Sequence, residues 1–484
     1  MAAIVWFRQD LRLEDNPALY HAVLSEKPIL PIYIYEDNNP QNPWPIGGAQ
    51  KWWLHHSLVS LKNALAEKGL NLYLLKGNPI ILLPELINKI QASGLFYNQC
   101  YEPFLLSQEK KLISELSNLD KNLDIKRYNA SLLLKPGAIK NASDSYFKVF
   151  TPFWRQVYKY LTAHPPHLLK KLPKRLSGFK FDLEGALLSD YQDIEALGLL
   201  PKLNWTKEFG AVWQPGEKGA QVRLKSFLKK GLANYANGRD MPSKAYTSGL
   251  SPHLHFGEIS PREIWQELVH HDDIKNAEKF LSELVWREFS YNLLYHYQNL
   301  PTQNFKSEFD NFVWQPDRNH LKAWQQGLTG YPIVDAGMRQ LWRTGTMHNR
   351  VRMIAASFLI KHLLIDWCEG EKWFWDTLVD ADLANNAASW QWVAGSGADA
   401  SPYFRIFNPI LQGQKFDPEG EYVKTWIPEL AKLTTKYIHE PWLAPESELK
   451  KANIVLGKNY PHPIIEHDFA RKRALEEYAK TKST

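Results

Sequence analysis

Residues 345–414 begin with GTMHNRVRMIAASFLIKHLLIDW, continue through WFWDTLVDADLANNAASWQW and reach SGADASPYFRIFNP before Gln414. Their apolar residues recur three to four positions apart, which predicts amphipathic helices. Indoles, carboxamides, a thioether and charged groups beside apolar residues suit a planar, redox-active ligand better than a hydrolytic site. The candidate ligand-facing side chains are Asn349, Arg352, Met353, Asp380, Asp382, Asn386, Trp390 and Trp392.

The composition of the 484 residues is that of a globular protein with an unusual number of tryptophans. Length alone predicts about three domains, and the hydrophobic content of 44% is ordinary. Fourteen of the 19 Trp residues lie from Trp205 onward, so we expect their function in the second half. The net charge of +6 permits a polyanionic partner without requiring one.

Only two cysteines, Cys100 and Cys368, are present, which gives neither a disulfide framework nor metal-ligand spacing. We therefore expect no metal site and a reducing, cytoplasmic location. The N-terminal MAAIVWFRQDLR lacks the pattern of a signal peptide. The apolar run Met353–Ile365 is interrupted by Lys361 and His362, so it predicts a core helix and no membrane span.

In residues 1–130, short apolar runs alternate with helical patterns, which predicts an α/β domain with a Rossmann-like parallel sheet covered on both faces. No G-x-G-x-x-G follows the first strand, so a nicotinamide site is not expected. The expected strands are Ile4–Phe7, Ile29–Tyr35, Leu72–Leu75, Gly94–Tyr97 and Leu123–Tyr128, and the expected helices are Ala49–Lys68, Pro79–Gln91 and Ser107–Leu119.

Residues 131–215 form a predicted connector, because periodicity weakens there and prolines cluster in HPPHLLKKLPKRL. Its basic run could touch DNA or simply be a solvated linker. From residue 216 to 484 strand signals almost vanish, which predicts a large all-α domain. The expected helices are Gly219–Lys230, Ser260–His270, Ala277–Tyr297, Val334–Arg343, Asn349–Cys368 and Lys372–Val379.

Three patterns in this half indicate ligand contacts. Small hydroxyl residues and a glycine in Thr247–Ser251 precede a Ser-Pro helix start, which suits an anion such as a pyrophosphate or is an ordinary cap. Glu283, Trp286 and Arg287 share a helix face, either for a flat ligand or as a salt bridge beside a core Trp. Arg352 lies on a largely apolar helix and needs an acidic partner, with Asp380 and Asp382 as candidates.

The motifs TSGLSP, ELVWREF, TGYPIVDAGMRQLW, MHNRVRM, DADLANNAASWQW and PYFRIFNP occur in this order. Together they resemble the DNA photolyase/cryptochrome family, and the resemblance runs nearly end to end. Within that family the chain looks most like the bacterial class III cyclobutane pyrimidine dimer photolyases. The resemblance implies an FAD-binding helical domain and light-driven splitting of pyrimidine dimers by electron transfer from excited reduced flavin.

The resemblance also implies roles for individual residues. FAD contacts would be Tyr235, Thr247, Ser248, Gly249, Leu250, Ser251, Arg287, Asn349, Arg352, Asp380, Asp382 and Asn386. The catalytic lesion pocket would include Glu283, Trp286, Asn349, Met353, Asn386 and Trp392, and electrons would pass through Trp390, Trp367 and Trp314. DNA phosphates would meet Arg239, Arg350 and Arg405.

The N-terminal motif WFRQDLRLEDNPAL also matches the family, where this domain holds an antenna chromophore. The resemblance implies 5,10-methenyltetrahydrofolate, with 8-hydroxy-5-deazaflavin as the alternative and Glu36 as a contact. Trp52 and Trp53, in GGAQKWWLHHSL, either belong to that site or pack in a helix. We expect a monomer that acts on UV-damaged DNA without an obligate protein partner.

Two other functions compete with repair. A cryptochrome-type blue-light receptor would use its flavin only to change conformation and partners. Plant cryptochromes have Asp at the position of Asn386 and usually a long C-terminal extension, whereas this chain has Asn and stops soon after ALEEYAK. Photolyases of the 6-4 type place two histidines in the lesion pocket, whereas MHNRVRM offers Asn349 and Met353 after His348. An ordinary flavin oxidoreductase would need a nicotinamide or small-substrate site, and no such motif is present.

Overall fold

The computed structural model describes residues 2–37, 39–119, 123–183, 191–399 and 404–481. Its first part is a five-stranded parallel sheet in the order β3-β2-β1-β4-β5. The strands are β1 (Ala3–Phe7), β2 (Ile29–Tyr35), β3 (Tyr73–Lys76), β4 (Gly94–Asn98) and β5 (Asp124–Tyr128). The doubly wound α/β expectation is therefore confirmed, with strand ends within one residue of those predicted.

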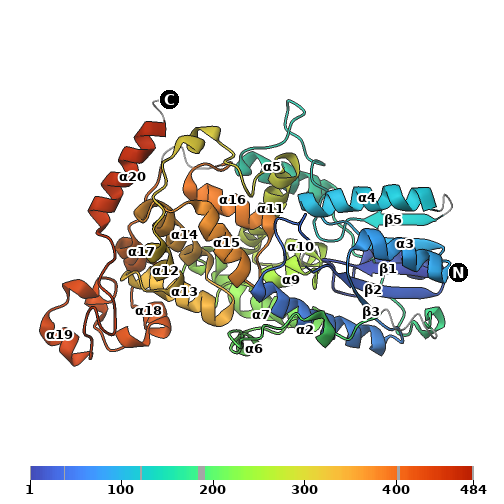
Figure 1. The fold of residues 1–484 in the computed structure, drawn as a ribbon, viewed down its shortest axis with the longest axis horizontal. Coiled ribbons are helices and arrows are strands. Elements are labelled where there is room, and N and C mark those ends of the chain that lie inside the picture. The colour runs from blue at the N-terminus through green and yellow to red at the C-terminus, as the bar shows by residue number, and fades with distance from the viewer. Residues whose placement is uncertain (1, 38, 120–122, 184–190, 400–403, 482–484) are drawn as a thin grey trace.

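Helices cover both faces of the sheet because each central strand buries both of its sides. Ala3, Val5 and Phe7 of β1 face one apolar cluster with α1 (Pro17–Leu24) and α2 (Gly48–Glu67). The alternate residues Ile4 and Trp6 face a second cluster with α3 (Pro79–Ile90) and α4 (Pro103–Leu119). Figure 1 shows this sheet half at the N-terminal end of an elongated molecule.

The connector joins both halves of the molecule rather than only crossing its surface. Leu132, Phe147 and the helix α5 (Phe150–Ala163) pack into the core of the helical half. Leu176 and Leu197, by contrast, are buried in the cluster on one face of the sheet. The weak periodicity predicted for the connector agrees with the largely irregular path of its described residues after Ala163, but leucines there are buried in the N-terminal core.

The remainder is almost entirely helical and surrounds one large apolar core (Figure 1). Two short π-helical turns, η4 (Phe227–Gly231) and η7 (Phe358–His362), continue α7 and α14. The helices are α6 (Phe209–Val212), α7 (Glu217–Ser226), α8 (Tyr235–Gly238), α9 (Ser251–His255), α10 (Pro261–Val269), α11 (Ile274–His296), α12 (Arg318–Gln326), α13 (Pro332–Thr344), α14 (Asn349–Ser357), α15 (Trp367–Thr377), α16 (Leu383–Ala394), α17 (Pro409–Phe416), α18 (Glu421–Trp426), α19 (Glu446–Lys451) and α20 (His467–Thr481).

One predicted helix is wrong in its extent. The continuous apolar period of Asn349–Cys368 suggested a single helix, but α14 ends at Ser357, passes through η7 and stops. Leu364 then adopts a left-handed backbone with φ 54°, and Asp366 caps the new helix α15 by accepting from the Cys368 N–H. The break lets α15 pack beside α16 and brings the relay candidate Trp367 to a helix N-terminus.

Candidate functional site

The segment Asp380–Asp382 lies where α14, α15 and α16 meet. The carboxylate of Asp382 caps α16 by accepting from Asn385, and it also accepts a 2.6 Å bond from the Tyr291 hydroxyl. His255 Nδ1 lies 3.6 Å from the same carboxylate. Burial alone would raise the pKa of Asp382, but the bond and charge of His255, with Arg287 and Tyr291, outweigh burial and hold that pKa below its usual range. Asp382 is therefore a fixed negative charge inside the helical half.

Arg352 pairs with Asp380, as its place on an apolar helix requires. Its Nη2 lies 3.0 Å from both carboxylate oxygens, and its Nε donates to the Met347 carbonyl at 2.7 Å. The Ser251 hydroxyl donates to the same aspartate at 2.6 Å. The Arg352 side chain is 24% exposed and Asp380 only 6%, so the arginine keeps an accessible edge beside a buried counter-charge. Such an edge can hold a second anionic or polar group.

The loop before α9 folds as a tight turn but is not a strong helix-dipole site. Gly249 has φ 62°, and a Cβ there would stand 2.8 Å from Arg223 Nη1, so both backbone and space favour glycine. Ser248 accepts a bond from the Leu250 N–H. Because α9 has only five residues, the phosphate affinity expected at this start must come from local hydroxyl and N–H groups.

Asn386 occupies a nearly closed position on α16, with its Nδ2 donating to the Glu371 carbonyl at 3.0 Å. The side chain of Glu371 is itself fully buried on α15, and neither carboxylate oxygen has a hydrogen-bond partner among the described residues. Burial raises the pKa of Glu371 well above its usual value, which favours the neutral form of this acid. The Asn386 carboxamide and the neutral form of Glu371 therefore place no negative charge at this position.

The α11 face resolves part of the ambiguity over Glu283, Trp286 and Arg287. Glu283 pairs with Arg239 across to α8 and with Lys279 at 3.2 Å on its own helix. Arg287 turns inward and donates to the Ser131 carbonyl at 2.6 Å. Trp286 stacks on Phe150 with ring centroids 3.6 Å apart and remains partly exposed. No Glu283–Arg287 ion pair forms, so the salt bridge considered between these two residues is excluded, and Glu283 pairs with Lys279 on α11 instead.

The start of α14 presents a second partly open surface. Asn349 is exposed, and Met353 is half-buried beside the Arg350 guanidinium, whose Nη1 lies 3.7 Å from the thioether. Arg350 also pairs with Asp240 at 2.9 Å. Burial lowers the pKa of the neighbouring His348 to about 4, so that histidine is neutral at pH 7. Arg239, with its guanidinium 5.4 Å from the Tyr235 ring, extends this surface toward α8.

The three relay candidates lie in, or packed against, the same apolar core. Trp390 is buried at 5.0 Å from the Phe374 ring, and Trp367 is buried in the same core with its indole N–H bonded to Asn304. Trp314 is partly exposed and packs 4.5 Å from Phe312 at the edge of that core. These positions fit both a relay and simple packing.

The tryptophan count also reflects a stack that the sequence patterns did not indicate. Trp342 lies 5.9 Å from Trp373 with nearly parallel rings, and Trp205 lies 5.0 Å from Trp342. Trp342 is 45% exposed, so this stack reaches the surface on the side of the connector.

The carboxyl edge of the parallel sheet, where ligands of this fold usually bind, is filled by its own side chains. Arg8 pairs with Glu109 at 3.2 Å, and these two side chains are only 6% and 3% exposed. Glu36 accepts a 2.7 Å bond from Gln108 and another from Asn39. The predicted antenna contact Glu36 therefore already has two protein partners.

A cavity of about 710 Å³ lies between α2 and the end of the connector. Such a volume suits a drug-sized or cofactor-sized ligand. Trp52 and His56 form one wall from α2, and Trp213 and Lys207 line it from the connector. The sequence offered only the WW pair as a signal for it.

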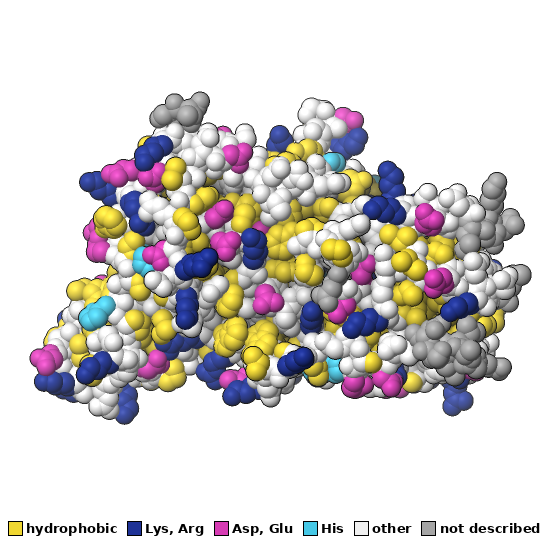
Figure 2. Space-filling model, viewed as in Figure 1, with side chains coloured by type: hydrophobic (Ala, Val, Ile, Leu, Met, Phe, Trp, Pro, Cys, Tyr) yellow, Lys and Arg dark blue, Asp and Glu magenta, His cyan; other side chains and the backbone are white. Residues whose placement is uncertain are grey.

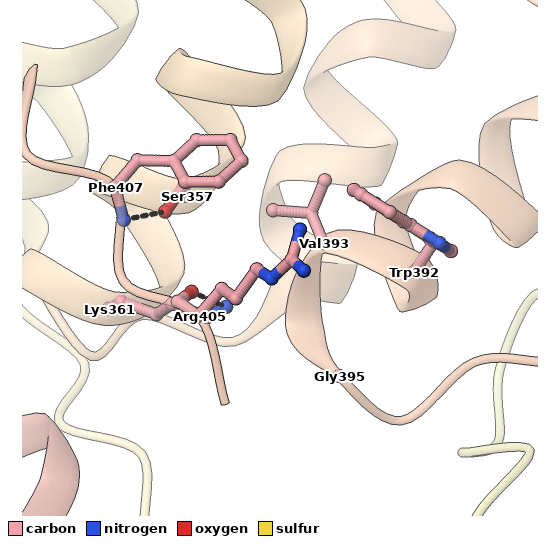
Figure 3. A pocket seen from close by; sticks show the side chains of 7 residues that line it. All are labelled: Ser357, Lys361, Trp392, Val393, Gly395, Arg405 and Phe407. Atoms are coloured by element: carbon pink, nitrogen blue, oxygen red, sulfur yellow. Dashed lines mark hydrogen bonds between the residues drawn. The ribbon is translucent and has the colours of Figure 1, made fainter. Parts of the chain in front are cut away.

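Arg405, a predicted DNA contact, is exposed in the segment Phe404–Phe407. Figure 3 shows its guanidinium reaching toward Val393 on the side of Trp392. Trp392 is half-buried and donates to the Asp399 carbonyl at 3.1 Å. Pro402 and Tyr403 of the PYFRIFNP motif lie outside the described residues. On the face in Figure 2, Lys and Arg are interspersed with Asp and Glu, as the modest net charge predicts.

Within the described ranges, no helix is long and apolar enough to cross a membrane. The same part of the chain contains no cluster of His, Cys, Asp and Glu that could hold a metal ion.

Comparisons with known proteins agree with this architecture. Residues 3–173 match the family model of DNA photolyase, and residues 280–480 match that of the FAD binding domain of DNA photolyase. A deoxyribodipyrimidine photo-lyase of Agrobacterium fabrum is 50% identical over 99% of this chain and 98% of its own length. Cryptochrome-2 of Arabidopsis thaliana is 37% identical over 99% of this chain and 79% of its own.

A solved structure, that of a bacterial class III photolyase from Agrobacterium tumefaciens, superimposes with a TM-score of 0.93 at 48% identity, covering all of this chain and 98% of that one. The chain belongs to the DNA photolyase/cryptochrome family. Among these three relatives it is more similar to the two bacterial photolyases than to the plant cryptochrome.

Proposed function

We propose that this protein is a deoxyribodipyrimidine photo-lyase, which uses light and FAD to split cyclobutane pyrimidine dimers in DNA. The observation that carries the proposal is the arrangement around α16. A buried, paired aspartate, an arginine with an open edge and a neutral carboxamide converge there, beside the partly exposed Trp286, Met353 and Trp392. The end-to-end similarity to photolyases supports the same function.

The donor set fits FAD. Arg352 can hold a polar edge of the isoalloxazine while Asp380 keeps the guanidinium oriented, and Asp382 can accept from a ring N–H. Asn386 can face the flavin without repelling a negative charge, because its carboxamide is neutral and burial favours the neutral form of its neighbour Glu371. Tyr235 and the Thr247–Ser251 loop would contact the phosphates, and Arg287 and Asn349 would complete the pocket. When bound and reduced, FAD supplies the photoexcited electron for ring splitting.

The lesion would enter the partly open surface of α11, α14 and α16. A dimer is poorly stacked, so its extrusion from the duplex costs little. Trp286 and Trp392 offer apolar faces for unstacked bases, Met353 offers a soft surface, and Glu283 can accept from base edges. Arg239, Arg350 and Arg405 would hold the flanking phosphates and make binding salt-dependent.

For the antenna we propose the cavity between α2 and residues 200–215, with 5,10-methenyltetrahydrofolate favoured over a deazaflavin. Trp52 and Trp213 give it aromatic walls, whereas the ion pair Arg8–Glu109 closes the sheet edge near Glu36. A Trp213→Leu variant should lose a near-ultraviolet band while keeping FAD, and Glu36→Gln should keep both. Loss of that band in the Glu36→Gln variant alone would instead assign the antenna site to the sheet edge.

We further propose the division into an antenna domain (1–130), a connector (131–215) and a catalytic domain (216–484) in a cytoplasmic monomer. The direct test of function is light-dependent repair of oligonucleotides that contain either a cyclobutane dimer or a 6-4 product. Purified protein should release about one FAD per chain and repair the cyclobutane dimer only. Repair of neither lesion by protein with reduced FAD would favour a cryptochrome-type receptor, in line with the similarity to the plant protein named Cryptochrome-2.

A further inference from the structure

The π-helical turn η7 contains a buried amine that the proposed repair chemistry does not use. Lys361 is 3% exposed, its Nζ donates to the Arg405 carbonyl, and the same nitrogen lies 4.5 Å from the centroid of the Phe404 ring. Lys361 has no acidic partner among the described residues. Burial lowers the pKa of this amine to about 7.

A second contact fixes the same segment one helical turn earlier. Ser357 accepts a 3.4 Å bond from the Phe407 N–H, and residues four apart lie on one face of a helix. A cavity of about 20 Å³, enough for one water, lies between this face and Trp392. Figure 3 shows both bonds on one side of the cavity and the Arg405 guanidinium beside Val393.

An amine buried without a counter-charge is costly, and an apolar side chain of the same length would avoid that cost. Lys361 instead reaches across the apolar core to hold one backbone carbonyl. The turn that presents it is π-helical, a geometry often found at functional sites. The segment it holds contains Arg405, one of the expected contacts with DNA phosphates.

We propose that Lys361 is a positioning residue for DNA binding. Together with Ser357 it fixes the backbone of Phe404–Phe407, so that Arg405 stays beside Trp392 at the wall of the lesion pocket. This inference rests on the proposed repair function and adds to it a residue that touches neither flavin nor lesion.

The amine also makes this arrangement sensitive to pH. A bound DNA polyanion favours the charged ammonium, so binding should take up a proton near pH 7. Other groups around the turn are Arg405 on the held segment, His362 on the turn itself, and His467 and Arg473 on α20. Of these, His362 lies 2.9 Å from His467 and Arg473 donates to the His362 carbonyl, so these groups contact α20, which also packs on the held segment through the stacked rings of Phe404 and Tyr478.

The test uses Lys361→Met, Lys361→Arg and the control Arg339→Met in the FAD-loaded protein. Arg339 also bonds a backbone carbonyl and pairs with Glu429, but it lies away from the proposed site. We expect Lys361→Met to weaken binding of a dimer-containing duplex about 10-fold and to raise KM similarly, since one charge-assisted bond is lost. Its kcat and flavin photoreduction should stay within about twofold of wild type.

The inference is overturned if Lys361→Met binds the duplex as wild type does, or if Arg339→Met at a matched loss of melting temperature weakens binding equally. A fall in kcat with unchanged KM would also overturn it. Wild-type protein that repairs no dimer would instead reject the proposed function itself.

Lys361→Arg provides the second measurement. If the methionine variant fails to fold, this variant alone tests whether Lys361 is coupled to DNA binding. Arginine stays charged throughout the pH range of this measurement. Between pH 6 and 8.5, wild-type affinity for the duplex should therefore fall more steeply than that of Lys361→Arg, with the difference centred near pH 7. Identical pH profiles of the two proteins would mean that the Lys361 charge is not coupled to DNA.

Discussion

The carboxyl edge of the sheet and the helical site around α16 both contain an arginine–carboxylate pair, but the two pairs differ in exposure. Arg8 and Glu109 are 6% and 3% exposed, so both side chains are buried. Arg352 keeps 24% of its surface open while Asp380 is buried. A parallel sheet normally binds its ligand at that edge. In this protein the pair at that edge is buried, whereas the pair among the helices keeps an accessible arginine.

This difference suggests that the first pair stabilises the fold whereas the second binds a ligand. Three substitutions test the distinction between a stabilising and a ligand-binding role, from the largest to the smallest expected effect on the free energy of unfolding. Each compares flavin content or photochemistry with stability, because a purely structural residue changes only the latter.

The largest loss of stability is expected for Glu109→Gln. Arg8 would then lose its ion-pair partner while it stays buried, which costs about 3–5 kcal/mol. Chemical denaturation at pH 7 measures this loss. FAD per folded chain should remain that of wild type. A variant that loses FAD but keeps its stability would place a cofactor function at the sheet edge.

A smaller loss of stability but a clear loss of flavin is expected for Arg352→Met. Its bonds to Asp380 and to FAD disappear together, and one charge-assisted bond accounts for about 10- to 100-fold in affinity. Equilibrium dialysis of FAD against the apoprotein measures the change. Arg339→Met, which breaks the pair with Glu429 in the same half, is the matched control and should bind FAD normally. Equal FAD affinity in both variants would contradict the assignment of Arg352.

The smallest effect on stability is expected for Trp367→Phe, about 1–2 kcal/mol, because phenylalanine keeps most of the apolar surface and leaves a small void. Photoreduction of oxidised FAD should nevertheless be nearly lost, since phenylalanine is much harder to oxidise. Repair should survive chemical reduction of the flavin. Trp265→Phe, at an equally buried indole in α10, should lose similar stability and photoreduce normally. If Trp367→Phe photoreduces as well, the Trp342–Trp373 stack becomes the alternative route, and Trp390→Phe then tests their shared starting point.

The sequence predicted the elements that are defined by the spacing of apolar residues a few positions apart. The parallel strands and the long helix α11 follow from apolar spacing. The cost of an unpaired charge predicted an acidic partner for Arg352, and the structure selects Asp380 from the two candidates. The break at Leu364 was missed, because an apolar run has the same period whether or not its backbone turns left-handed.

Long-range contacts were also beyond the sequence. Nothing local indicates that Lys361 bonds a carbonyl 44 residues away, or that Arg8 and Glu109 close the sheet edge across 101 residues. The cavity beside Trp52 likewise forms only when residues 200–215 fold back onto α2. Such sites need the tertiary structure, although each of their residues is visible in the sequence.

The contacts of α2 with the helical half limit how the two halves could be exchanged between relatives. Gly48 donates to Asp376 at 2.8 Å, Gln50 donates to the Ala381 carbonyl, and Trp375 donates to the Pro45 carbonyl at 2.7 Å. A chimaera with the sheet half of one parent and the helical half of another would therefore need residues 45–50 and 375–381 from the same parent. Otherwise the mismatch would fall next to Asp380 and Asp382, and a graft meant to change the antenna would disturb flavin binding.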